Sequence, residues 1–122
     1  MTVHSVKCKV NASGNYETNL DHFKQMVEED RKQGLIPVLY IATVGTTSTF
    51  ACEQLKEIRQ ICDQEDMWLH VDSAMAGFAC CVDQHRQYLF KDIEFGHSLT
   101  VNFSKWPGGG MDSSFLWSSR KS

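Results

Sequence analysis

Two ionisable residues that each follow an apolar segment are the ones best placed in this sequence to do chemistry. Asp72 comes directly after the run 67–71, in HVDSAMAG, and Lys105 comes directly after SLTVNFS. A carboxylate at the end of a buried strand is partly desolvated and needs a partner. Asp72 therefore either caps the turn that follows or holds a cationic ligand, such as a protonated pyridine nitrogen. The residues alone leave both interpretations open.

Lys105 also has two interpretations. A lysine that follows a buried strand is commonly a solvated strand end, whereas an amine enclosed in a pocket can form a Schiff base with an aldehyde cofactor. The Gly-Thr-Thr-Ser segment at 45–48 is either a plain polar loop or a contact for cofactor oxygens. The sequence has no P-loop and no G-x-G-x-x-G pattern, so it gives no support for a nucleotide site.

Composition is that of an ordinary globular protein, with 42% hydrophobic and 22% charged residues in a chain of 122, which predicts one domain or part of one. The net charge of -3 gives no general attraction to nucleic acid or to an anionic membrane. No apolar run approaches the ~20 residues of a membrane helix. The five cysteines, without a C-x-x-C pair, indicate reduced thiols in the cytoplasm and no metal site.

Apolar periodicity predicts alternating strands and helices. In order, the predicted elements are a strand at 6–10, a helix ending near Gly34, a strand at 36–43, a helix at 53–64, a strand at 67–71, a helical segment near 84–90, and strands at 98–103 and 113–117. Thr18 and Asp21 have the spacing of a capping box for the first helix. The continuous apolar run at 36–43 is typical of a strand covered on both faces. This alternation favours an α/β fold with a mostly parallel sheet and flanking helices.

In parallel sheets, ligands bind beyond the carboxyl ends of the strands. Thr46 and Thr47, Asp72 and Lys105 follow three successive strands, so we expect them to converge on one pocket. His70 is expected to be a hydrogen-bonded histidine within its strand. Four further histidines are expected at the surface: His4, His22, His85 and His97.

Four motifs occur in a characteristic order: GLIPVLYIATVGTTSTFA, ICDQEDMWLHVDSAMAG, SLTVNFSKW and MDSSFLW. Together they resemble the group II decarboxylases that depend on pyridoxal 5'-phosphate (PLP), with the strongest likeness to the aromatic-L-amino-acid decarboxylase branch. The likeness runs from about Val6 to Trp117. It implies the aspartate aminotransferase-like fold of PLP-dependent transferases. Residues 1–122 would be a single partial domain, the central and carboxyl-terminal part of the PLP-binding large domain.

The resemblance also implies residue roles. Lys105 matches the lysine that forms the internal aldimine, and Asp72 matches the partner of the pyridine nitrogen. Ala74 matches the small residue that packs against the cofactor ring. The residues expected to bind the cofactor are Thr47, Asp72, Ala74, Asn102, Ser104 and Lys105. The implied reaction is decarboxylation of an L-amino acid, aromatic by first preference, to an amine and carbon dioxide.

The sequence departs from the family pattern at several positions. Ser104 replaces the usual histidine beside the lysine, Met75 replaces a tyrosine, and Pro107 with three glycines replaces an apolar stretch. Family members are several times longer and form homodimers, and their ring-stacking histidine, main phosphate loop and small domain have no counterpart here. We therefore keep two alternatives: a catalytically inactive fragment or paralogue, and an unrelated α/β binding module. The isolated chain is expected to show little or no turnover.

Overall fold

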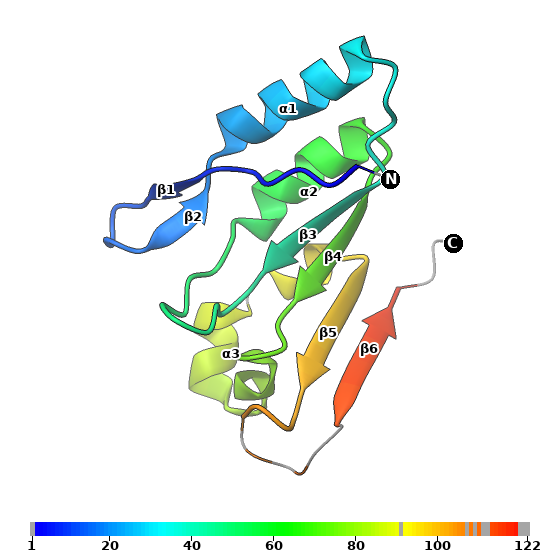
Figure 1. The fold of residues 1–122 in the computed structure, drawn as a ribbon. Coiled ribbons are helices and arrows are strands. Elements are labelled where there is room, and N and C mark those ends of the chain that lie inside the picture. Colours follow the sequence, from blue (N-terminus) through cyan, green and yellow to red (C-terminus); the bar gives the residue numbers. More distant parts are fainter. Residues whose placement is uncertain (1, 91, 107, 109, 111–112, 120–122) are drawn as a thin grey trace.

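The computed structural model describes residues 2–90, 92–106, 108, 110 and 113–119 (Figure 1). Its main sheet has four strands in the order β3-β4-β5-β6. Strands β3 (Leu39–Thr43), β4 (Trp68–Asp72) and β5 (Ser98–Asn102) are parallel, and β6 (Ser114–Ser118) pairs antiparallel with β5. The α/β class and the mostly parallel sheet predicted from the sequence are confirmed.

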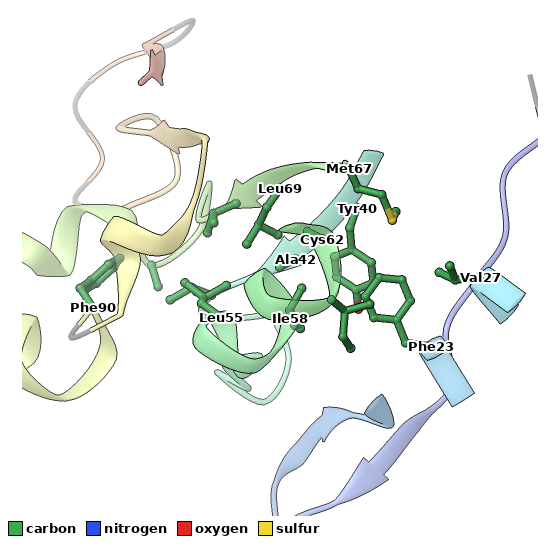
Figure 2. Close-up of a cluster of buried hydrophobic side chains, with 14 of the residues drawn as sticks. Phe23, Val27, Tyr40, Ala42, Leu55, Ile58, Cys62, Met67, Leu69 and Phe90 are labelled. Atoms are coloured by element: carbon green, nitrogen blue, oxygen red, sulfur yellow. The ribbon is translucent and has the colours of Figure 1, made fainter. Parts of the chain in front are cut away.

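Helices α1 (Leu20–Lys32) and α2 (Leu55–Gln64) lie along one side of this sheet, and their buried side chains form the core with it (Figure 1). Figure 2 shows Leu55 and Ile58 of α2 in the same buried cluster as the sheet residues Tyr40, Ala42 and Leu69. Ile58 and Leu69 are fully buried. In β3 and β4, buried residues alternate with more exposed ones, so every second residue of these two strands faces the helices, as expected for a period of two.

The opposite face of the sheet is less covered. Leu39 and Ile41 of β3 are 47% and 57% exposed, whereas Tyr40 and Ala42 between them are buried. The prediction that this strand is covered on both faces is wrong for the described residues. The continuous apolar run instead places large apolar side chains on an open face.

The amino-terminal segment forms a hairpin of β1 (Cys8–Val10) and β2 (Tyr16–Thr18), whose second strand the sequence did not predict. The predicted capping box is also wrong: Asn19 caps α1 by accepting a hydrogen bond from the His22 N–H. Thr18 is buried instead. Gly34 follows the helix with a φ of +75°, as predicted.

The segment between β4 and β5 contains two short 3₁₀ helices, η1 (Gly77–Cys81) and η2 (Ile93–Phe95), on either side of α3 (Asp83–Leu89). His97 follows this segment, and the prediction that it lies at the surface is wrong. Its ring is buried, stacks on Trp68 with 4.8 Å between ring centroids, and accepts a hydrogen bond from the Leu69 N–H. No helix in the described ranges is long and apolar enough to cross a membrane.

Candidate functional site

The carboxyl ends of the three parallel strands lie side by side at one edge of the sheet (Figure 1). In the register, Thr43 of β3 is the partner of Asp72, and Asp72 is the partner of Thr100 of β5. Val71 is fully buried against the helices, so Asp72 faces the open side of the sheet. Thr100 and Asn102 share that face because they alternate with the buried Val101.

Asp72 begins a tight turn that joins β4 to η1. Its Oδ1 accepts a hydrogen bond of 2.9 Å from the Ala74 N–H, so Asp72 does cap the turn. The side chain is half-buried and belongs to none of the ion pairs found among the described residues. The capping interpretation and the ligand interpretation are therefore compatible, because the second carboxylate oxygen is not used by the turn.

The same turn is tied to both neighbouring strands. Ser73 is fully buried and donates through Oγ to the Val44 carbonyl at 2.9 Å. Ala74 accepts a hydrogen bond of 3.3 Å from the Asn102 N–H through its backbone carbonyl. These contacts fix the end of β4 between the ends of β3 and β5.

Close packing adds to this restraint at Gly45, in the polar loop after β3. Gly45 has a φ of +78°, and a Cβ placed there would lie 2.1 Å from the Cβ of Ala76. Ala76 is itself fully buried. The loop and the turn after Asp72 are therefore in contact at a position that only glycine fits.

Asn102, Ser104 and Lys105 form a turn at the end of β5. Asn102 Oδ1 accepts hydrogen bonds from both the N–H and the Oγ–H of Ser104, with 2.8 Å for the backbone bond. The Lys105 N–H donates to the Asn102 carbonyl at 3.4 Å. The Lys105 side chain is exposed and forms no ion pair with the described residues. Pro107 and Gly109, which belong to the Pro-Gly-Gly-Gly departure from the family pattern, lie outside the described residues.

The loop after β3 positions its two threonines differently. Thr46 Oγ1 accepts a hydrogen bond of 3.0 Å from the Ala51 N–H and contacts Thr49 Oγ1 at 3.0 Å, so Thr46 stabilises the loop. Thr47 is exposed, and its hydroxyl has no hydrogen bond to any described residue. Of the two, Thr47 has the side chain free to contact a ligand.

A half-buried acidic residue that follows this loop, Glu53, was not recognised as a structural centre from the sequence. Glu53 accepts hydrogen bonds from Thr18 Oγ1, from the Tyr40 hydroxyl at 2.9 Å and from the Thr43 N–H at 3.0 Å. Burial raises the pKa of Tyr40 well above its ordinary value, and the nearby Glu53 carboxylate adds to the shift. Glu53 thus connects the carboxyl end of β3 to the hairpin. The only signal in the sequence was its proximity to the GTT segment.

A cavity of about 510 Å³ opens beside Trp106, between the β1–β2 turn, the polar loop and α3. Phe50, Tyr88 and Trp106 supply its aromatic wall. Neither Asp72 nor Lys105 lines this cavity, so it is separate from the strand-end site. The cysteines of the chain are unpaired thiols, and no cluster of three metal-binding side chains occurs among the residues described.

Comparison with known proteins identifies the family. Residues 2–122 match the pyridoxal-dependent decarboxylase conserved domain. This chain belongs to the pyridoxal-dependent decarboxylase family. Mouse aromatic-L-amino-acid decarboxylase is 37% identical over 120 residues, which make up 98% of this chain and 25% of the mouse protein. Rat histidine decarboxylase is 41% identical over 103 residues, 84% of this chain and 16% of the rat protein.

Solved structures of the family share the fold. The crystal structure of Catharanthus roseus tryptophan decarboxylase in complex with L-tryptophan superposes with a TM-score of 0.74 at 35% identity. That match covers 84% of this chain and 22% of the plant protein. The predicted family and fold class are thus confirmed, and the cofactor of the family is pyridoxal phosphate. The chain spans about a quarter or less of the length of these relatives.

Proposed function

We propose that this chain forms part of the cofactor site of a PLP-dependent amino-acid decarboxylase, with Lys105 bound to the cofactor aldehyde and Asp72 paired with the pyridine nitrogen. The observation that carries the proposal is that Asp72 ends β4 and Lys105 lies in the turn directly after β5, the adjacent parallel strand. The membership of the chain in the pyridoxal-dependent decarboxylase family supports the same assignment.

The spacing of the two strand ends suits a ligand one ring wide. Adjacent strands lie roughly 4.8 Å apart and rise about 3.3 Å per residue, which puts the Cα of Asn102 about 8 Å from that of Asp72. The turn that begins at Asn102 keeps the Cα of Lys105 within about 7 Å of the Cα of Asn102. A flexible four-carbon side chain can then bring the Lys105 amine to a ring that contacts Asp72.

The chemistry of the donor set also fits the cofactor. When bound, pyridoxal phosphate supplies an electron sink for the pair left behind as the substrate carboxylate departs as carbon dioxide. The Asp72 carboxylate favours the protonated pyridine nitrogen. A close ion pair near a protein surface is worth about 4 kcal/mol at an effective dielectric constant of ~20. Asp72 therefore keeps the ring nitrogen charged at neutral pH, which the reaction requires.

The remaining predicted residues take supporting roles. Ala74 follows Asp72 by two residues and presents only a methyl group, which leaves space for a flat ring. Thr47 offers a free hydroxyl from the loop after β3. The Asn102 Oδ1 already accepts hydrogen bonds from Ser104, which hold the Asn102 side chain in place. The Asn102 amide N–H₂ would then donate to cofactor oxygens.

The proposed substrate is an L-amino acid, with an aromatic one preferred because the likeness to mouse aromatic-L-amino-acid decarboxylase extends over 98% of the chain. For the whole protein we propose release of the amine and carbon dioxide by a homodimer. The isolated 122-residue chain is proposed to bind the cofactor without turnover. Lys105 is exposed, and a site open to water does not strengthen the electrostatic interactions that catalysis uses.

Borohydride trapping tests the cofactor assignment. The chain is incubated with pyridoxal phosphate, reduced so that the lysine–aldehyde linkage becomes a stable secondary amine, and digested for peptide mapping. We expect the label on Lys105 in clear excess over the surface residues Lys7 and Lys9, and a reduced excess in Asp72→Asn. Equal labelling of all lysines would refute the site. Release of amine by the purified chain would refute the proposed lack of turnover.

A further inference from the structure

The open face of the sheet carries a row of hydrogen-bonded side chains that joins β4 to β5, beneath the proposed site. Trp68 Nε1–H donates to Ser98 Oγ at 2.8 Å, and Ser98 Oγ lies 2.7 Å from His70 Nδ1. On the other side of the ring, His70 Nε2 lies 3.2 Å from Thr100 Oγ1. One imidazole on β4 thus contacts two hydroxyl groups on β5.

The protons of this row can be ordered consistently. The indole N–H is a donor only, so Ser98 Oγ accepts from it and retains its own proton to donate to His70 Nδ1. His70 then carries its proton on Nε2 and donates it to Thr100 Oγ1. Trp68, Ser98 and His70 each act once as a donor along the row, and Thr100 accepts the last hydrogen bond and keeps its own hydroxyl proton. Thr100 is the residue of β5 paired with Asp72.

From this geometry we infer that His70 is a positioning residue: it clamps β4 to β5 through Ser98 and Thr100 and so sets the spacing between Asp72 and Lys105. This inference rests on the proposed function for the roles of those two residues. The clamp lies within two residues of Asp72 on the same strand and the same face. On the other side of β4, the partner of His70 is Ile41, whose apolar side chain offers no hydrogen bond. The clamp therefore acts on the β4–β5 pair alone.

Amide hydrogen exchange of the full chain without cofactor measures the clamp directly. The Ser73 N–H bonds to the Thr100 carbonyl at 2.9 Å and the Asn102 N–H bonds to the Ala74 carbonyl, so both report on the β4–β5 ends. The Val44 N–H bonds to the Asp72 carbonyl at 3.0 Å and reports on the β3–β4 ends. We expect His70→Phe to speed exchange at Ser73 and Asn102 by about thirtyfold, the effect of losing two ordinary hydrogen bonds. Val44 should not change.

Matched substitutions separate the clamp from a general loss of stability. Ser98→Ala should reproduce the pattern, whereas Ser118→Ala should not, because Ser118 is the residue of β6 paired with Ser98 and its hydroxyl lies outside the row. Thr100→Val should also speed exchange at the two β4–β5 amides, and Thr100→Ser should restore the native rates. Equal acceleration at all three amides, or none in His70→Phe, would overturn the inference.

Trapping with pyridoxal phosphate then links the clamp to the site. In His70→Phe the excess of label on Lys105 over Lys7 should fall several-fold, while Ser118→Ala should keep the native excess. An unchanged excess in a His70→Phe chain whose β4–β5 amides exchange faster would overturn the spacing role. If the native chain itself shows no excess on Lys105, the proposed function fails, and the exchange pattern still decides whether the clamp exists.

Discussion

Replacing Gly45 by alanine tests whether the loop after β3 must touch the turn after Asp72. Two effects add in Gly45→Ala. A left-handed conformation costs an alanine about 1–2 kcal/mol, and the φ of Gly45 is +78°. The new Cβ would also lie 2.1 Å from the Cβ of the buried Ala76, an overlap that typically costs about 1–3 kcal/mol more. The expected loss of unfolding free energy is therefore about 2–5 kcal/mol.

Gly14 is the matched control, because its φ is +81° and no atom lies within 4 Å of the position of its Cβ. Gly14→Ala should thus show only the conformational cost of about 1–2 kcal/mol. Urea unfolding of both variants gives the difference. The double variant Gly45→Ala with Ala76→Gly should recover part of the loss, since it removes the opposing methyl group. If Gly45→Ala is no less stable than Gly14→Ala, the contact between loop and turn is not made as described.

Three further predictions concern stability and reactivity. Tyr40→Phe should lose about 1.5–3 kcal/mol, because the Tyr40 hydroxyl donates a hydrogen bond to the Glu53 carboxylate. Because folding raises the pKa of Tyr40, the contribution of this side chain to stability is complete below pH ~10 and falls as the pH rises further. Between pH 9 and 11, Tyr40→Phe should therefore lose less unfolding free energy than the native chain. Denaturant titrations at each pH measure the difference. Leu69→Ala should lose about 2–5 kcal/mol in urea unfolding, whereas Leu39→Ala, at a 47% exposed residue, should lose far less. Burial raises the pKa of Cys62 to about 12, so iodoacetamide at pH 8 should modify the exposed Cys8 and Cys81 before it modifies Cys62. Peptide mapping would show the order, and equal rates would contradict the buried position of Cys62.

The sequence predicted the parallel core of the fold because its elements have strong local periodicity. The helix predicted at 53–64 forms as Leu55–Gln64, and the strand predicted at 67–71 forms as Trp68–Asp72. The strand Tyr16–Thr18 was missed because three residues are too few to show alternation. Thr18 has helix-capping chemistry, yet its hydroxyl bonds to Glu53, which lies 35 residues away in the sequence.

For the candidate site, the order of strands was sufficient to place Asp72 and Lys105 at neighbouring carboxyl ends. The sequence could not specify contacts that depend on the register between strands. The row formed by Trp68, Ser98 and His70 is one such contact, and the burial of His97 against Trp68 is another. Both arise only once β4 and β5 are paired.

The protonation state of the cofactor ring in the trapped chain reports directly on the pairing of Asp72 with the ring nitrogen. With ¹⁵N-labelled pyridoxal phosphate reduced onto Lys105, the ¹⁵N chemical shift of the pyridine nitrogen reports whether that nitrogen carries a proton. We predict a protonated nitrogen at pH 7.5 in the native chain and a largely unprotonated one in Asp72→Asn. The same shift in both chains would mean that Asp72 does not face the ring held by Lys105, and the proposed cofactor site would be refuted.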